Sequence, residues 1–168
     1  MEIRLTLSLP REEISIPVVR RLCAQSLRVL GVSGGCAQDV ELALAEACAN
    51  VLLHATQDDQ YEVTVGVDDR VAVIEVVDHG GGIDLAAALA GAPAPGALSM
   101  IVPTPETLPE QGRGILLMRA LMDSVQLHRL EGDRQGTHVH LEKTLEWDET
   151  APVVRLGRLQ AEPVATDL

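Results

Sequence analysis

The sequence predicts one two-layer α/β domain, in which a mixed, mostly antiparallel sheet carries its helices on one face. Three observations support this fold class. Five segments show the alternation or the short apolar runs of strands, and two long segments have the periodicity of helices. The length of 168 residues suits a single domain with an adequate core. With one Trp, one Tyr and no Phe, that core must consist of Leu, Val, Ile and Ala.

The chain is expected to begin with a strand and a long helix. Apolar and polar residues alternate from Ile3 to Pro10, and the proline favours a strand at the edge of the sheet. A helix should follow over Arg11 to Leu30. Its predicted inward side chains are Val18, Leu22, Leu27 and Leu30, and its outward ones are Arg20, Arg21 and Arg28.

A second helix and a hairpin come next. Residues 31–35 (GVSGG) are predicted to form a turn, and Asp39 to Ala55 form a helix with apolar residues on two sides. Two apolar segments, Tyr61 to Val67 and Val71 to Val77, are separated by the short polar stretch 68–70. This spacing predicts two antiparallel strands joined by a tight turn.

The remaining chain contains a long loop and a closing hairpin. From Gly82 to Gln111 the chain is rich in Ala, Pro and Gly, with at most a short helix near residues 85–89, and a loop of this length is usually a lid or a binding segment. The later predicted elements are a helix over Gly114 to Met122 and strands over Val125 to Leu130 and Thr137 to Leu145. We place the domain at residues 1–147 and a flexible or docking tail at 148–168.

Composition excludes several classes of function. The net charge of −12, with only 13 Lys and Arg, argues against nucleic-acid binding and favours basic partners. No apolar run reaches the length of a membrane span, and the first residues do not form a signal core, so we expect a cytoplasmic protein that does not enter a membrane. Cys23, Cys36 and Cys48 lack the spacing of metal ligands, so they should be buried, reduced thiols.

The second helix contains two polar residues that its apolar surroundings do not explain. Glu46 and Asn50 lie one turn apart and share a narrow stripe with Asp39 and His54. A half-buried carboxylate or amide without a partner costs about 1–3 kcal/mol, so a ligand, a metal or a partner should offset that cost. The alternative is that both side chains reach solvent along the edge of the helix.

Three glycine-containing sites follow in the chain. In the segment 78–82 (DHGGG), Asp78 could accept a hydrogen bond from an exocyclic amine while the glycines admit a flat ring, although an ordinary turn would look the same. Gly112 and Gly114 precede a helix whose free amides could bind an anion or simply form an N-cap. Gly136 and Thr137 could serve a ligand or finish a turn. No P-loop and no dinucleotide fingerprint is present.

The order of these motifs resembles the GHKL, or Bergerat-fold, ATPases. The order is E-x-x-x-N, D-x-G-x-G, a long loop, G-x-G and G-T, and it covers about residues 1–145. Within that family the chain looks like the anti-sigma-factor serine kinase branch. Residues 44–55 (LAEACANVLLHA) resemble the N-box of that branch, and residues 112–123 (GRGILLMRALMD) resemble its second glycine box.

The resemblance implies ATP and Mg²⁺ as ligands and a role for each matching residue. Asn50 would bind the Mg²⁺ that bridges the phosphates, and Glu46 would be the general base. Asp78 would bind the adenine amine. The other implied contacts are Gly80, Gly82 and Thr137 around the base, and Gly112, Arg113 and Gly114 around the phosphates. His79 departs from the family, which often has a small polar residue at this position.

The resemblance also implies a partner-switching regulator of transcription. Such a protein uses ATP to phosphorylate a serine of an anti-anti-sigma (STAS-type) partner and sequesters a sigma factor, and the outward face of the first helix with Arg20 and Arg21 resembles the family's docking surface. One alternative is a nucleotide-responsive module that sequesters a partner without kinase activity. Another is the ATP-binding half of a sensor histidine kinase. Whether the chain forms a homodimer is left open.

Overall fold

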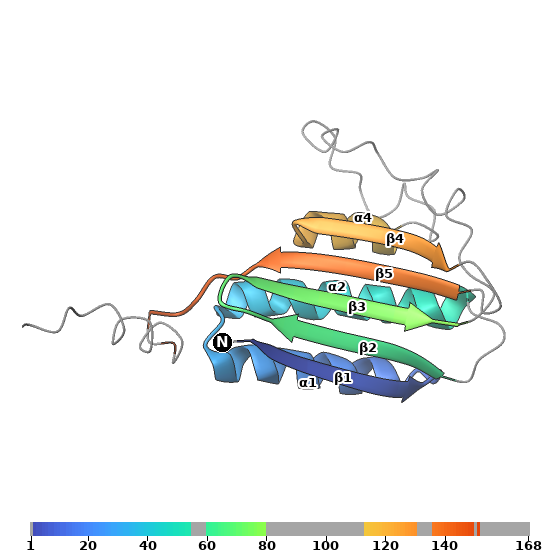
Figure 1. Cartoon of the computed structure of the whole chain (residues 1–168), viewed down its shortest axis with the longest axis horizontal. Coiled ribbons are helices and arrows are strands. Elements are labelled where there is room, and N and C mark those ends of the chain that lie inside the picture. The colour runs from blue at the N-terminus through green and yellow to red at the C-terminus, as the bar shows by residue number, and fades with distance from the viewer. Residues whose placement is uncertain (1, 55–59, 80–112, 131–135, 150, 152–168) are drawn as a thin grey trace, which may run out of the picture.

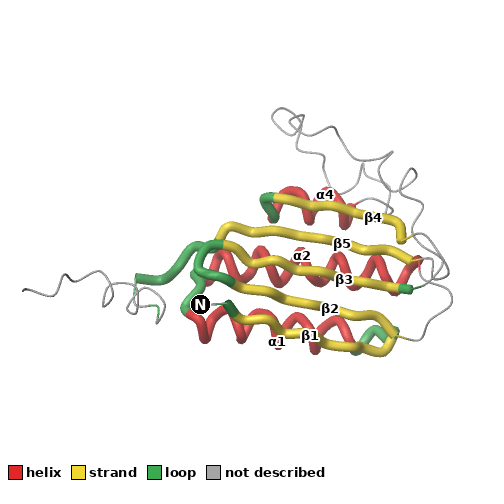
Figure 2. Tube along the Cα trace, viewed as in Figure 1, coloured by secondary structure: helices red, strands yellow, loops and turns green. Residues whose placement is uncertain are grey.

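The computed structural model describes residues 2–54, 60–79, 113–130, 136–149 and 151. Strands and helices follow one another in the predicted order (Figures 1 and 2). The elements are β1 (Ile3–Pro10), α1 (Ser15–Leu30), α2 (Gly34–His54), β2 (Gln60–Val67), β3 (Val71–Asp78), α4 (Arg113–Leu121), β4 (Ser124–Leu130) and β5 (Gly136–Thr144).

The described strands form one sheet in the order β1-β2-β3-β5-β4, and the helices lie on one of its faces (Figure 1). The two-layer fold and the edge position of β1 are therefore confirmed. Every neighbouring pair is antiparallel, so the described strands hold no parallel pair, although the prediction was of a mixed sheet. β3 and β4 run in the same direction, but they do not pair with each other, because β5 lies between them and pairs with both.

The bounds of the helices differ from the prediction at their N-termini. α1 begins at Ser15 instead of Arg11, because Pro10 to Ile14 form turns in which the Glu12 and Ser15 amides donate to carbonyl oxygens two or three residues earlier. α2 begins earlier than predicted, at Gly34. The short helix predicted near residues 85–89 and the proposed lid lie outside the described residues.

The inward face of α1 was predicted wrongly. Val18 and Leu22 are 45% and 44% exposed, whereas the neighbouring Val19 and Cys23 are buried. Leu27 is buried as predicted, and Leu30 is partly buried against the core. In the first turns of α1 the buried apolar residues are thus Val19 and Cys23, and Val18 and Leu22 face outward.

α2 is the central helix of the layer. It contacts α1 on one side and α4 on the other, and it packs over β3 and β5. Its core side chains are fully buried, and they include Val40, Ala43, Leu44, Ala47 and Cys48. Among the helices that the structure describes, none is both long and apolar enough to cross a membrane. Because α2 is flanked on both sides, Glu46 and Asn50 are partly buried instead of fully exposed to solvent.

Candidate functional site

Glu46 and Asn50 of α2 face the first turn of α4. A Cβ atom added to Gly114 would lie 2.8 Å from Oε2 of Glu46 and 3.5 Å from Oδ1 of Asn50. Both side chains are half-buried. The absence of a side chain at Gly114 leaves room for the Glu46 carboxylate in its present position. The structure thus brings together three of the residues that the sequence singled out, from two segments of the chain.

Asn50 provides a buried polar group that no described residue satisfies. Its Nδ2 atom is buried and has no hydrogen-bond partner in the described part of the chain. Such an atom costs about 1–3 kcal/mol unless a ligand binds it, so a site for a ligand is the physical interpretation that this residue favours. Rotation of the amide would place its oxygen at the same position, which is the ligand type that Mg²⁺ accepts. The residue therefore fits the metal that the sequence motifs imply.

Asp78 and Thr137 form a second group of site residues on adjoining strands. Asp78 is the last residue of β3, Thr137 is directly opposite it on β5, and both are buried. A side chain at Gly136 would collide with the carbonyl oxygen of Asp78, so this glycine is required by the close approach of the two strands. A buried carboxylate beside a hydroxyl can accept a hydrogen bond from an amine.

Arg11 is a site residue that the sequence analysis missed. Its Nη2 atom donates to Oδ1 of Asp78 at 2.9 Å, and both side chains are largely buried. The Nε atom of Arg11 is also buried, without a hydrogen-bond partner among the residues described. The two residues lie 67 positions apart in the chain, and no motif or spacing links them. The only available signal was a lone arginine in the turn after a strand.

The two groups lie at the same end of the domain. The C-terminal end of α2, the end of β3 and the start of β5 are together in Figure 1. Arg113 begins α4 beside Gly114 and is exposed. The remaining predicted contacts, Gly80, Gly82 and Gly112, lie outside the described residues.

Asp39 of the polar stripe on α2 and Arg20 of the outward face of α1 each pair with another residue of the domain. Asp39 accepts a hydrogen bond from Lys143 at 2.9 Å, so it belongs to the packing of α2 against β5. Arg20 donates to Glu41 of α2 at 2.9 Å and is only partly exposed, whereas Arg21 is exposed as predicted. Nothing is described of the His54 side chain.

Comparison with known proteins identifies relatives over most of the chain. Residues 9–143 match the family model described as the histidine kinase-like ATPase domain. Proteins named serine-protein kinase RsbW from Bacillus cereus (strain G9842) and Bacillus mycoides (strain KBAB4) are each 28% identical over 132 residues, which is 77% of this chain and 79% of theirs.

A solved structure has the same fold. The crystal structure of the RsbU and RsbW domains of a Mycobacterium tuberculosis protein superposes with a TM-score of 0.59 at 18% identity. The match covers 85% of this chain and 32% of that one, so the present chain spans about a third of its length. At this identity the likeness concerns the fold alone.

Proposed function

The chain belongs to the histidine kinase-like ATPase domain family, and on that premise we propose that it is an anti-sigma factor with serine-protein kinase activity. In this proposal it uses ATP to phosphorylate a serine of an anti-anti-sigma partner, and it sequesters a sigma factor. The relatives named serine-protein kinase RsbW support the kinase class. The observation that carries the proposal is the close packing of Glu46 and Asn50 against Gly114, together with the buried Nδ2 atom of Asn50, which has no hydrogen-bond partner among the described residues.

Each described site residue has a proposed task in phosphoryl transfer. Asn50 holds Mg²⁺, which when bound neutralises phosphate charge. Gly114 leaves room for phosphate oxygens at the start of α4, where the helix dipole favours anions. Glu46 accepts the proton of the serine hydroxyl as that oxygen attacks the terminal phosphorus, and the bond from this phosphorus to the bridging oxygen breaks so that ADP leaves. Arg113, at the same helix start, neutralises charge on the transferred group.

The adenine base is proposed to bind beside Asp78 and Thr137. A carboxylate accepts a hydrogen bond from the exocyclic amine of adenine, and the threonine hydroxyl adds a second polar contact. Burial of both residues strengthens this discrimination, because a base that offers a carbonyl oxygen instead would place two hydrogen-bond acceptors against each other where little water can separate them. Gly80 and Gly82 would complete the base pocket, and Gly112 would contact the phosphates.

The protein partner is proposed to bind the outward face of α1. Val18 and Leu22 are exposed there, and Arg21 lies beside them. An apolar strip next to a charged side chain is typical of protein interfaces. The net charge of −12 favours a partner with a basic docking surface.

The proposal is tested with radiolabelled ATP and candidate anti-anti-sigma proteins. The wild-type chain should label a serine of the partner, and Glu46→Gln should bind ATP but transfer no phosphate. Asp39→Asn is the matched control, because it removes one carboxylate from the same stripe of α2 at a residue that pairs with Lys143. Normal transfer by Glu46→Gln would remove Glu46 from the mechanism. ATP binding by the wild type without any labelled partner would favour the partner-sequestering module that has no kinase activity.

A further inference from the structure

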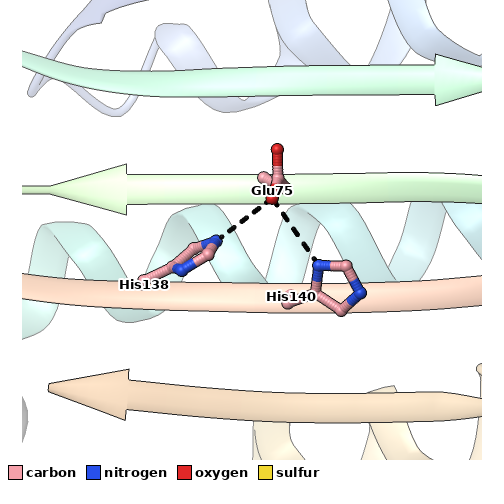
Figure 3. A group of neighbouring side chains, drawn as sticks. All are labelled: Glu75, His138 and His140. Carbon is pink, nitrogen blue, oxygen red and sulfur yellow. Dashed lines mark ion pairs between the residues drawn. The ribbon is translucent and has the colours of Figure 1, made fainter.

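Glu75, His138 and His140 form a cluster on the face of the sheet that points away from the helices. Glu75 lies on β3 directly opposite His140 of β5, and His138 is two residues earlier on the same face of β5. Figure 3 shows the three side chains pointing toward one another in front of the strands. All three are partly exposed, so a dissolved ion can reach them.

The distances within the cluster are those of metal ligands. Oε1 of Glu75 lies 3.5 Å from Nε2 of His138 and 3.7 Å from Nδ1 of His140. Hydrogen bonds between nitrogen and oxygen are shorter, at about 2.7–3.2 Å. Zinc binds histidine nitrogen and carboxylate oxygen at about 2.0–2.2 Å, which places neighbouring tetrahedral ligands about 3.4 Å apart. The three ligand atoms all lie within 4.8 Å of one another, so small side-chain rotations complete the site.

A second carboxylate orients His140. Nε2 of His140 lies 2.9 Å from Oε1 of Glu142. A carboxylate only accepts hydrogen bonds, so Nε2 carries the shared proton, and in the neutral ring Nδ1 has a lone pair directed at Glu75. Histidines that bind metals usually donate their other ring N–H to a carboxylate in this way.

His138 contacts Glu75 at the distance of an ion pair but not at that of a hydrogen bond. Its Nε2 atom is buried and makes no hydrogen bond within the part of the chain that the structure describes. It faces Oε1 of Glu75, as does Nδ1 of His140. A cation between these three atoms satisfies all of them at once.

We propose that Glu75, His138 and His140 bind a divalent transition metal of the zinc class, with solvent in the fourth position. Two imidazoles and one carboxylate suit zinc, whereas Mg²⁺ prefers oxygen ligands. The ion cross-links β3 to β5 on the side of the sheet opposite to Glu46 and Asn50. This site is thus separate from the proposed nucleotide site, and its presence does not depend on kinase activity.

The test is calorimetric titration of the full chain with zinc chloride in the presence of excess Mg²⁺. The wild type should bind one ion, and Glu75→Gln, His138→Gln and His140→Gln should each abolish binding. Glu142→Gln should weaken binding by about 10- to 100-fold, because it removes the carboxylate that orients His140.

His128→Gln is the matched control. His128 lies on the same face of the sheet, with its ring 6.1 Å from that of His138, but it is outside the ligand group. It should bind zinc as the wild type does. Circular dichroism without metal checks that each variant is folded, which is expected at partly exposed positions. The proposal is overturned if folded wild-type protein binds no zinc, if the ligand variants still bind it, or if His128→Gln loses binding equally.

Discussion

Replacing Gly114 with alanine should disturb the position of the Glu46 side chain in the site while changing the stability of the domain little. The new Cβ atom would lie 2.8 Å from Oε2 of Glu46, about 0.6 Å short of an ordinary contact. The obstacle is the far end of a flexible side chain, so the Glu46 carboxylate can rotate away while the backbone stays in place. Asn50 is touched less, because its Oδ1 atom would lie 3.5 Å from the new atom.

The expected cost to stability is small and the expected cost to activity is large. Alanine favours a helix over glycine by about 0.5–1 kcal/mol, and a side chain forced from its preferred rotamer costs about 0.5–1.5 kcal/mol. These terms nearly cancel, so the free energy of unfolding should change by less than about 1 kcal/mol. A displacement of about 1 Å in a catalytic group can cost about 100-fold in rate, so the shift of Glu46 should lower phosphate transfer by about 10- to 100-fold.

Urea denaturation and the radiolabel transfer assay measure the two effects on the same preparation. Gly35→Ala is the matched control, because this glycine is also near the start of a helix and an added Cβ would meet nothing within 4 Å. It should leave transfer unchanged. Transfer by Gly114→Ala at the wild-type rate would refute the reasoning, as would a loss of stability above about 2 kcal/mol, since that would mean the backbone and not the Glu46 side chain has to move.

Three further predictions concern stability. Arg11→Met removes the guanidinium that pairs with the buried Asp78 carboxylate and should lower the free energy of unfolding in urea by about 3–5 kcal/mol. A loss below about 1 kcal/mol would show that the pair acts like a surface pair. Gly136→Ala places a methyl group against the backbone of Asp78 and should destabilise the domain by at least about 1–3 kcal/mol, so a wild-type melting temperature would contradict it. Burial raises the pKa of Cys23 and of Cys48 from 9.0 to about 12, so these thiols ionise first in the unfolded chain. The contribution of each thiol to stability should be complete below about pH 9 and fall by up to about 1.4 kcal/mol per pH unit between about pH 9 and 12. Each cysteine-to-alanine variant should lose the contribution of its own thiol in urea denaturation at these pH values.

The sequence predicted the order of the elements and the shared helix stripe of Glu46 and Asn50, because both depend on local periodicity. Alternation located β1, β2 and β3, and the helical period placed Glu46 and Asn50 on one stripe of α2. The contact of that stripe with Gly114 could be expected only from the order of the motifs. Periodicity says nothing about which helix lies beside which.

The face of α1 shows where periodicity fails. Two apolar stripes run along this helix, one with Val18 and Leu22 and one with Val19 and Cys23. Both stripes have helical spacing, and the stripe with Val18 and Leu22 was predicted to be buried because Leu22 is larger than Cys23. The close approach of α2 buries the second, smaller stripe instead, and this is decided by packing between helices that the sequence pattern does not encode.

The Arg11–Asp78 ion pair was beyond prediction for a related reason. The two residues come together because β1 and β3 both pair with β2 and run in the same direction, so that both end beside the start of β2, and this places the turn after β1 near Asp78. Only the register of Leu9 with Tyr61 and of Tyr61 with Asp78 fixes that proximity. A single arginine in a turn carries no sign of such a long-range contact.

The most direct test of the central claim is a calorimetric titration of the wild-type chain with ATP and with GTP, each with and without Mg²⁺. If Asn50 holds the metal and Asp78 accepts the adenine amine, ATP should bind in a Mg²⁺-dependent way, and GTP, which offers a carbonyl oxygen at that position, should bind far more weakly. Absence of Mg²⁺-dependent ATP binding, or equal binding of GTP, would contradict the claim that these residues form one adenine-nucleotide site.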